Sequence, residues 1–394
     1  MSITLLFKSL LQRKVITALL LVQLTLTLAL LSNSILLSTQ AYQLSNQPTG
    51  LQLDTTLAIE LKPTDDNLIV HPALGELIQR QLAALRQIAG VRYAAFSNQT
   101  PLIFGGMNGN VYIEDKEDTT NVETVPYNFA EAELFDTLQM TLLHGRWLSA
   151  EDKNVENVVL TDKLAKQLFG DSHLAIGQQI NSGTVVGVVA DIMYQRFASD
   201  QYFGLFFNSD LNRADYGYRL LLQVDAKAVD AVRQQINSSL RHVEPEIDIQ
   251  QVVSLRQLHR DYFEQERGLA ILLSVLSGLM LVVAMISAYS HALFHGVQQQ
   301  NEIGVKRALG ASKQRILIEV LSESWLTTGM GAATGLLASY LLQQQLATVI
   351  SLPALPLWLP LSGALTLLLC VTIATWYPAA IATRVSPATA TKAL

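Results

Sequence analysis

The sequence has 394 residues, of which half are hydrophobic and only 15% are charged. Soluble globular proteins carry about 25% charged residues, so this composition indicates extensive contact with lipid and excludes a disordered chain. The net charge of −6 gives no reason to expect binding to nucleic acid. Because Cys370 is the single cysteine, an internal disulfide is excluded and a thiolate metal site is disfavoured.

Four apolar stretches are each long enough to cross a bilayer as a helix, which takes roughly 20 residues. They are Val15–Leu37, Leu269–Phe294, Ile316–Leu342 and Leu357–Ala382. The first stretch resembles a cleaved export signal, but its 23 residues exceed the usual length of a signal core, about 7–15 residues, so we interpret it as an anchor. The third stretch carries Glu319 and Glu323 in its first two turns.

Charge is distributed very unevenly along the chain. Residues 38–267 contain 18 Lys and Arg against 30 Asp and Glu, whereas the other 164 residues contain nine Lys and Arg against three Asp and Glu. The nine cations lie beside the apolar stretches: Lys8, Arg13, Lys14, Lys306, Arg307, Lys313, Arg315, Arg384 and Lys392. Because basic flanks stay in the cytoplasm, we expect both termini and the loop 295–315 inside, and residues 38–267 outside.

The expected fold class is a membrane protein with four transmembrane α-helices and a large extracytoplasmic α+β domain between the first and second helices. The expected segments are a cytoplasmic N-terminus (1–14), the first helix (15–37), an outer domain with a stalk (38–267), the second helix (268–294), a cytoplasmic loop (295–315), the third helix (316–342), a short outer loop (343–356), the fourth helix (357–382) and a cytoplasmic tail (383–394).

The outer segment is predicted to contain two β-α-β units separated by an insertion, which indicates a split α+β domain. The first unit is the strand Leu51–Leu61, a helix from His71 to Ala89 closed by Gly90, and the strand Val91–Ser97; the second is Arg219–Val224, the helix Lys227–Arg241 and Ile247–Val253. The insertion holds a loop with Gly105, Gly106 and Gly109, the acidic stretch Glu114–Asp118, then Asn157–Leu160, a helix at Lys163–Phe169 and the strand Thr184–Ile192. Residues Leu255–Arg267 are predicted to be a helical stalk that continues into the second span.

Motifs for several common chemistries are absent from the sequence. It has no GxxxxGK[ST] phosphate-binding loop, no GxSxG nucleophile elbow and no HExxH zinc motif. His291 and His295 have the i,i+4 spacing of zinc ligands, but Ala292 stands in place of a general base, so we interpret them as cations at a helix C-terminus. The acidic residues of 115–123 favour a solvated loop over a calcium site, since Thr120 occupies the position of the required glycine.

Two features of the third apolar stretch are candidates for function. Glu319 and Glu323 form an i,i+4 ladder with Arg315, and pairing with Arg315 or at a helix interface is favoured over a proton relay. Gly331 and Gly335 form a GxxxG pattern, which allows close approach of another helix.

The loop between the second and third spans carries the most specific pattern. Residues 301–310 are predicted to form a short amphipathic helix that ends at Gly310, and Ser312 is placed to cap the third span. Such a helix is suited to docking into a cytoplasmic partner. A positively charged topogenic loop without a partner fits the spacing about equally well.

This loop resembles a known family. Glu302, Ile303, Gly304, Val305, Lys306, Arg307, Ala308, Leu309 and Gly310 closely resemble the EIG-[IV]-[RK]-x-A-[LV]-G-A signature of the FtsX-like permeases, and more narrowly of the MacB-type ABC transporter permeases. Other parts of the chain are also similar to that family: Phe135–Trp147, Val158–Asp171, Val185–Asp191 and the tail Tyr377–Ala390. The resemblance covers essentially the whole chain.

The resemblance implies a permease subunit in the bacterial inner membrane that works as a dimer, with a second copy or a paralogous permease, and with two ABC ATPase subunits. Glu302–Gly310 would be the coupling helix. ATP and Mg would bind to the ATPase, so no catalytic, cofactor or metal site is expected on this chain. Because only 14 residues precede the first span, the ATPase is expected on a separate chain. A periplasmic adaptor, an outer-membrane channel and membrane lipid are further candidate partners.

The implied function is mechanotransmission, in which ATP-driven movement is passed to the outer domain for export or extraction of a peptide, lipopeptide, lipoprotein or drug. The alternative is a non-transporting FtsX-like regulator that passes the state of the ATPase to a periplasmic cell-wall enzyme. The outer domain of about 230 residues favours export. A third class, an anchored enzyme, is disfavoured by the missing catalytic motifs.

Overall fold

The computed structural model describes residues 14–103, 106–114, 116–195, 200–216, 218–348 and 354–383. The chain divides into two compact units, one formed by Ser45–Glu264 and a helical one formed by Met1–Leu44 with Gln265–Leu394. The expected basic residues Lys8, Arg13, Arg384 and Lys392, the end of the tail motif, Gly105 and residues 349–353 of the short outer loop lie outside the described residues.

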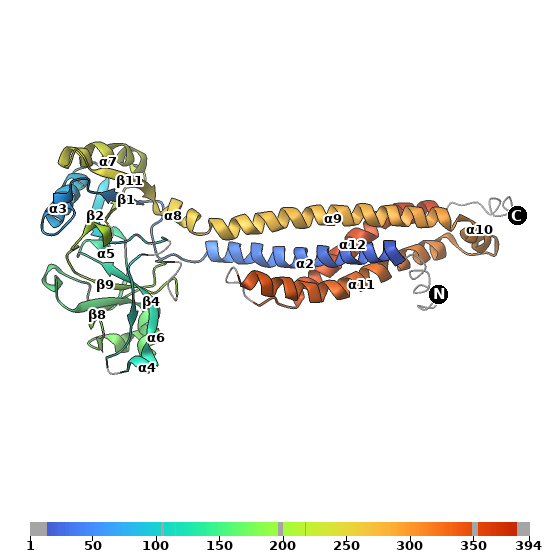
Figure 1. Ribbon diagram of the computed structural model, residues 1–394, viewed down its shortest axis with the longest axis horizontal. Helices are drawn as coiled ribbons and strands as arrows, with labels where there is room; N and C mark the ends of the chain where they lie inside the picture. Colours follow the sequence, from blue (N-terminus) through green and yellow to red (C-terminus); the bar gives the residue numbers. More distant parts are fainter. Residues whose placement is uncertain are drawn as a thin grey trace. The chain divides into compact units, whose positions relative to one another are not determined.

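In the described residues, the helical unit contains four long helices and one short helix (Figure 1). They are α2 (Lys14–Ser45), α9 (Glu264–Gln298), α10 (Gln300–Ala308), α11 (Lys313–Ala347) and α12 (Trp358–Ala382). One apolar cluster joins all four long helices, with Leu24 and Leu28 from α2, Ala284 and Ala288 from α9, Leu367 and Val371 from α12, and Ala332 of α11 packed against it. The four apolar stretches of the sequence are therefore four helices packed together.

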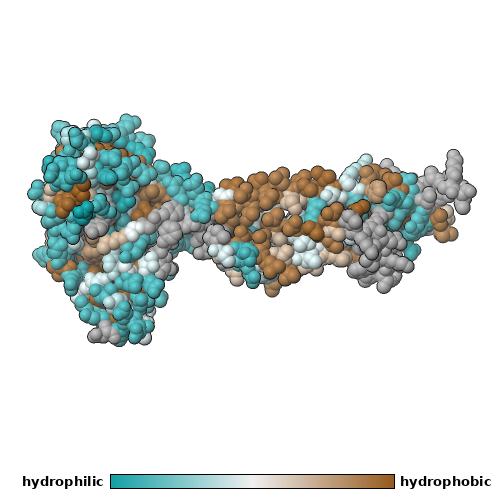
Figure 2. Space-filling model, in the orientation of Figure 1, coloured by the Kyte–Doolittle hydropathy of each residue, from teal (hydrophilic) through white to brown (hydrophobic). Residues whose placement is uncertain are grey.

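Three of these helices are long and apolar enough to cross a membrane. Their segments Ile16–Gln43, Arg267–Gln298 and Trp358–Ala382 have mean hydropathies of 1.9, 2.8 and 1.8. Helix α11, which covers the third expected span, is not one of them, because its 35 residues include two acids and several amides and hydroxyls. On the face that Figure 2 shows, hydrophobic residues cover most of the middle of the helical unit, whereas the other unit is mostly hydrophilic.

The unit Ser45–Glu264 contains a four-stranded antiparallel sheet with two helices. Its strands β1 (Thr56–Lys62), β2 (Val91–Ser97), β10 (Arg219–Val224) and β11 (Asp248–Ser254) lie in the order β11-β1-β10-β2. Helix α3 (Ala73–Arg86) connects β1 to β2, and α7 (Val229–Val243) connects β10 to β11. The two β-α-β units are thus interleaved in one sheet, which confirms the predicted split α+β domain.

The core of this first sheet follows from the apolar stripe of α3. All six residues of the predicted stripe are buried: Leu74, Leu77, Ile78, Leu82, Leu85 and Ile88. They pack with Leu57 and Ile59 of β1 and with Ile236 of α7 in one cluster. Gly90 then turns the chain into β2 with a φ of +99°, a conformation that favours glycine.

The insertion between β2 and β10 forms a second sheet. Its strands are β3 (Asn108–Val111), β4 (Val122–Phe129), β5 (Leu142–Gly145), β6 (Asn157–Thr161), β7 (Gln179–Ile180), β8 (Gly183–Val189) and β9 (Leu205–Phe207). They lie in the order β3-β4-β9-β6-β8-β5, with β7 paired to β8. Helix α6 (Asp162–Phe169) packs Leu164, Ala165 and Leu168 onto the core of this sheet.

Short helices fill the connections of the same unit. They are α4 (Glu117–Thr120), α5 (Leu134–Thr137), α8 (Leu255–Tyr262) and the 3₁₀ turns η1 (Asp66–Leu68), η2 (Ala150–Asp152), η3 (Ser172–Ala175) and η4 (Ala214–Tyr216).

Some predicted elements were wrong in extent or kind. The strand expected at Leu51–Leu61 begins only at Thr56, because a turn precedes it, and the strand expected to reach Ile192 ends at Val189. Gly109 lies in strand β3 rather than in a loop, paired with Val125 of β4. The predicted stalk is interrupted at Phe263, whose φ of −105° and ψ of 9° end α8 before α9 begins.

Candidate functional site

Helix α10 occupies the loop that carries the family-like signature. Gly310 ends it with a φ of +94°, and the N–H groups of Gly310 and Ala311 donate to the carbonyls of Arg307 and Lys306. The Oγ of Ser312 then accepts the N–H of Arg315 at 3.3 Å and caps α11. These bonds satisfy groups that a helix end leaves open. The predicted short helix, its glycine end and the Ser312 cap are confirmed.

One face of α10 is fixed to the helical unit. The side chain of Ile303 is buried in a cluster with Ile316 of α11 and Ala382 of α12, and Gly304 beside it is buried as well. The Nζ of Lys306 lies 2.7 Å from a carboxylate oxygen of Glu319 and 2.9 Å from one of Glu302. Burial lowers the pKa of Lys306, but its bonds to both acids outweigh burial, so the pKa is raised above its usual value.

The opposite face of α10 is open to its surroundings. We define this outer face by Glu302, Val305, Ala308 and Leu309, all of which are exposed. Val305 is 51% exposed and Leu309 is 84% exposed, and the two lie one helical turn apart. Helix α10 is thus anchored on one side and exposes two apolar side chains beside Glu302 on the other.

The two acids of α11 each have a cationic or imidazole partner. Glu319 contacts Lys306 of α10, which folds back against the first turns of α11. Of the two expected pairings, with Arg315 or at a helix interface, the structure shows the second. The Oε2 of Glu323 lies 2.8 Å from the Nε2 of His295 on α9. His295 lies in the last turn of α9, as expected, and there it is the partner of an acid. No group of three or more metal-ligand side chains occurs among the described residues.

The GxxxG pattern of α11 faces helix α2. A Cβ placed on Gly331 would lie 2.7 Å from the Cβ of Leu24, and one on Gly335 would lie 2.9 Å from the Cβ of Leu28. Real Cβ atoms do not approach this closely, so glycine is required for the two helices to touch. The helix that approaches the pattern belongs to the same chain.

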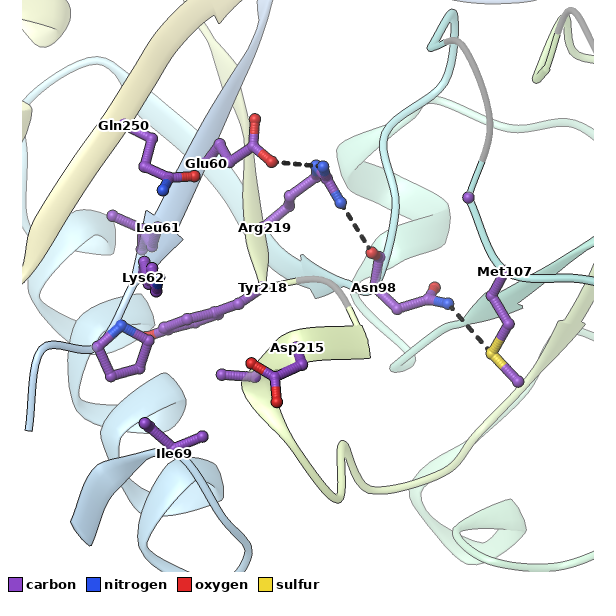
Figure 3. A pocket seen from close by; sticks show the side chains of 13 residues that line it. Glu60, Leu61, Lys62, Ile69, Asn98, Met107, Asp215, Tyr218, Arg219 and Gln250 are labelled. Carbon is purple, nitrogen blue, oxygen red and sulfur yellow. Dashed lines mark hydrogen bonds and ion pairs between the residues drawn. The ribbon is translucent and has the colours of Figure 1, made fainter. Parts of the chain in front are cut away.

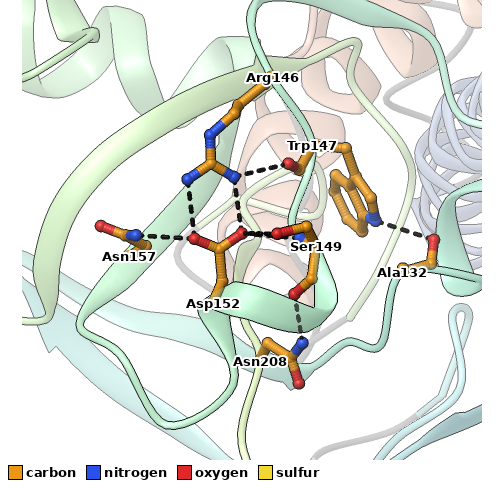
Figure 4. Close-up of polar contacts among 7 residues, drawn as sticks. All are labelled: Ala132, Arg146, Trp147, Ser149, Asp152, Asn157 and Asn208. Atoms are coloured by element: carbon orange, nitrogen blue, oxygen red, sulfur yellow. Dashed lines mark hydrogen bonds and ion pairs between the residues drawn. The ribbon is translucent and has the colours of Figure 1, made fainter.

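In the other unit, the family-like stretch around Arg146 builds a polar turn around the buried Asp152 (Figure 4). Arg146 donates two hydrogen bonds to Asp152, at 2.6 and 2.8 Å. Asp152 is buried and also accepts the N–H of Ser149 and the amide of Asn157, each at 2.7 Å. The Arg146 guanidinium holds the pKa of Asp152 well below its usual range. Sequence analysis missed Asp152, although Ser149-x-x-Asp152 is a helix-capping pattern that points to it.

A pocket of about 480 Å³ lies beside the first sheet (Figure 3). Arg219 of β10 lies between Glu60, at 2.5 Å, and the carbonyl of Asn98, at 3.1 Å. The opposite charges of Arg219 and Glu60 therefore neutralise each other. Lys62, Tyr218 and other side chains complete the lining.

Comparison with known proteins finds two family matches along the chain. Residues 21–239 match the family described as MacB-like periplasmic core domain, and residues 274–387 match the FtsX-like permease C-terminal family. The first match covers more than half of the chain.

Individual relatives are distant. The "Uncharacterized ABC transporter permease YvrN" of Bacillus subtilis is 23% identical over 252 residues, which cover 59% of this chain and 61% of that protein. The "Macrolide export ATP-binding/permease protein MacB" of Escherichia coli K12 is 23% identical over 280 residues, 66% of this chain and 42% of that protein. The chain thus spans about two fifths to three fifths of the length of these relatives. The crystal structure of the periplasmic region of MacB from Actinobacillus actinomycetemcomitans covers 55% of this chain and 95% of that one, with 14% identity and a TM-score of 0.36.

Proposed function

Because the chain belongs to the MacB-type, FtsX-like ABC transporter permeases, with a MacB-like periplasmic core domain, we propose that it couples ATP hydrolysis by a separate ATPase to movement of that domain. In this mechanotransmission, the ATPase grips α10 from the cytoplasm and the helical unit passes the movement on. ATP and Mg are held by the ATPase, since the sequence has no phosphate-binding loop.

The observation that carries this proposal is the two-sided construction of α10. A topogenic loop needs only positive charge near a membrane-spanning helix. It does not need Ile303 buried against two helices, or Lys306 paired with an acid of α11. A partner that presses on the outer face of an anchored helix displaces the helices beneath it. Docking is therefore favoured over the purely topogenic interpretation.

We place α11 in the membrane as well, as the third of four spans. An unpaired acid is costly inside a bilayer, whereas a paired one costs less. Both acids of α11 have partners within the unit, Glu319 in Lys306 and Glu323 in His295. With four spans, the distribution of charge puts both termini and α10 in the cytoplasm of a bacterial inner-membrane protein and the core domain in the periplasm.

The name of one relative supports export as the function of the complex. One of them is named for macrolide export, and we propose for this chain a substrate among peptides, lipopeptides, lipoproteins and drugs. A second permease copy or a paralogue completes the dimer, and a periplasmic adaptor with an outer-membrane channel extends the path. A non-transporting regulator of a cell-wall enzyme would use the same α10 and differ in what the core domain touches.

Co-purification with candidate ABC ATPases from the same organism tests the docking role. We expect Leu309→Asp to reduce the retained ATPase at least about tenfold, since it places a charge where an apolar contact forms. Glu302→Lys, which reverses a charge on the same face, is expected to weaken retention as well. Leu174→Asp is the matched control, because Leu174 is also an exposed leucine but lies in the core domain. Equal retention by wild type and Leu309→Asp would contradict the proposal.

ATPase activity of the purified complex separates export from regulation. Stimulation by a macrolide, a lipopeptide or a lipoprotein supports export. Stimulation only by a periplasmic cell-wall hydrolase supports the regulator.

A further inference from the structure

Helices α9 and α10 meet at a joint of one residue. Helix α9 ends at Gln298 and α10 begins at Gln300, and Gln299 between them has a φ of −94° and a ψ of 9°. The N–H of Gln299 donates to the carbonyl of His295 at 3.0 Å, and its own carbonyl accepts the N–H of Ile303 at 2.9 Å. Backbone bonds therefore continue across the joint, but a single backbone position sets the direction of α10.

Helix α11 holds the chain on both sides of this joint. Before it, the Nε2 of His295 lies 2.8 Å from the Oε2 of Glu323. After it, the Nζ of Lys306 lies 2.7 Å from the Oε1 of Glu319. Because Glu319 and Glu323 are one turn apart on the same face of α11, one helical face grips the end of α9 and the body of α10 together.

The two contacts differ in strength. His295 and Glu323 are only 5% and 8% exposed, and the side-chain amide of Gln299 lies 3.0 Å from the same ring nitrogen of His295. Removal of one partner of a buried pair leaves the other uncompensated, so this contact is costly to break. The Lys306–Glu319 pair is more exposed and contributes less. Ile303 adds an apolar contact between the two.

We propose that Glu319 and Glu323 are positioning residues for coupling: through Lys306 and His295 they make α9, the Gln299 joint, α10 and α11 one rigid lever. A displacement of α10 then moves α9 and α11 together, whereas without the two contacts α10 pivots about Gln299 and the movement is lost. The role in coupling rests on the proposed function, but the rigidity of the joint is a property of this chain alone.

Distances between spin labels test the joint without any ATPase. The full-length chain carries Cys370→Ala, with labels attached at Leu309→Cys on α10 and Leu279→Cys on α9, both exposed positions. It is placed in lipid nanodiscs and diluted with unlabelled chain, so that only distances within one chain are measured. The wild-type background is expected to give one narrow distance.

Glu323→Ala and His295→Ala are each expected to lose the narrow distance and give a broad distribution. The exchanged pair, His295→Glu with Glu323→His, is expected to restore it, which a loss of packing alone would not predict. Ser322→Ala is the matched control, because Ser322 lies between the two acids and its hydroxyl donates to the carbonyl of Glu319 in its own helix. Glu319→Ala breaks the more exposed pair and provides a variant that does not disturb the buried interior.

A narrow distance retained in Glu323→Ala, His295→Ala and Glu319→Ala would overturn the proposal. With an ABC ATPase present, the label of α10 is moved to the exposed Gln300, which is not part of the outer face. ATP is then expected to leave the label distance unchanged in the wild-type background, because α9 and α10 move together, and to change it in Glu323→Ala, where α10 moves alone. An ATP-driven change of this distance in the wild-type background, or the same unchanged distance in Glu323→Ala, would also overturn the lever. A wild-type chain that binds no ABC ATPase would instead overturn the proposed function, while the label distances still decide whether the joint is rigid.

Discussion

Leu28 of helix α2 lies so close to Gly335 of helix α11 that a Cβ on the glycine would be 2.9 Å from the Cβ of the leucine. Leu24 meets Gly331 in the same way one turn earlier. The same Leu28 also limits α12, where a Cβ on Gly363 would lie 3.0 Å from its Cδ1. One leucine of α2 therefore fills a groove between two other helices, and the glycines on both sides set how closely the bundle packs.

Gly331→Leu is expected to destabilise the fold of the single chain by about 1–3 kcal/mol, because the larger side chain must displace Leu24. The measurement is the unfolding transition of the full chain in detergent. Gly329→Leu is the control: Gly329 lies on the same helix, but a Cβ there would meet nothing within 4 Å. Equal unfolding of the two variants would show that α2 does not pack on the glycine face.

A second glycine prediction concerns the core domain. Gly145 and Gly170 both have a positive φ, of +71° and +81°, so alanine at either position costs about 1–2 kcal/mol in backbone strain. At Gly145 a Cβ would also lie 2.2 Å from the carbonyl oxygen of Val186, whereas at Gly170 it meets nothing within 4 Å. We expect Gly145→Ala to lower the free energy of unfolding by about 3 kcal/mol or more, clearly beyond Gly170→Ala. Denaturant unfolding followed by tryptophan fluorescence measures both, and similar losses would contradict the clash.

Asp152 predicts a pH dependence of stability. Its pKa is depressed in the folded chain by Arg146, while an unfolded Asp has a pKa of about 3.9. The stabilisation by ionised Asp152 is therefore fully present above about pH 5. It is lost as the pH falls below the pKa of Asp152 in the unfolded chain towards its lower pKa in the folded chain. Asp152→Asn is expected to cost about 2–3 kcal/mol at pH 7, because it removes charge-assisted hydrogen bonds.

The difference between wild type and Asp152→Asn should shrink below about pH 4, as Asp152 becomes protonated in the unfolded chain and then in the folded one. Asp118→Asn, at an exposed position of the same unit, should show little cost at any pH. If Asp152→Asn lowers the free energy of unfolding by the same amount down to pH 3, the charge of the carboxylate does not contribute to stability.

The elements that could be predicted are those with a local pattern. The apolar stripe of α3 repeats with the period of a helix, and β2 and β10 have the predicted bounds because each is a short run of strand-forming residues between turns. Gly310 and Ser312 mark the end of α10 and the start of α11 in the sequence itself. Strands β3 and β4 have no such pattern: Asn108–Val111 does not alternate, and β4 contains Pro126, which disfavours a strand. They exist because they pair with each other and β4 pairs with the distant β9.

At the candidate site too, local sequence patterns predicted only part of the structure, as the partners of the two acids of α11 show. Residue type alone indicates that Glu323 needs a partner inside an apolar bundle, and this need is met. The i,i+4 rule pointed to Arg315 for Glu319, but it considers one helix at a time. Lys306 and His295 are placed by the packing of α10 and α9 against α11, which no local spacing encodes.

The orientation of the chain can be tested by labelling two single cysteines in a Cys370→Ala background. The acidic segment 38–267 and the basic flanks predict that Leu174 faces the periplasm and Leu309 the cytoplasm. Both residues are exposed within their own units, so a thiol at either site should react once a reagent reaches it. In intact cells, a maleimide that crosses only the outer membrane is expected to label Leu174→Cys, and to label Leu309→Cys only after the inner membrane is opened. The reverse pattern would place α10 outside the cell, where no ATPase could act on it, and would remove the basis for coupling.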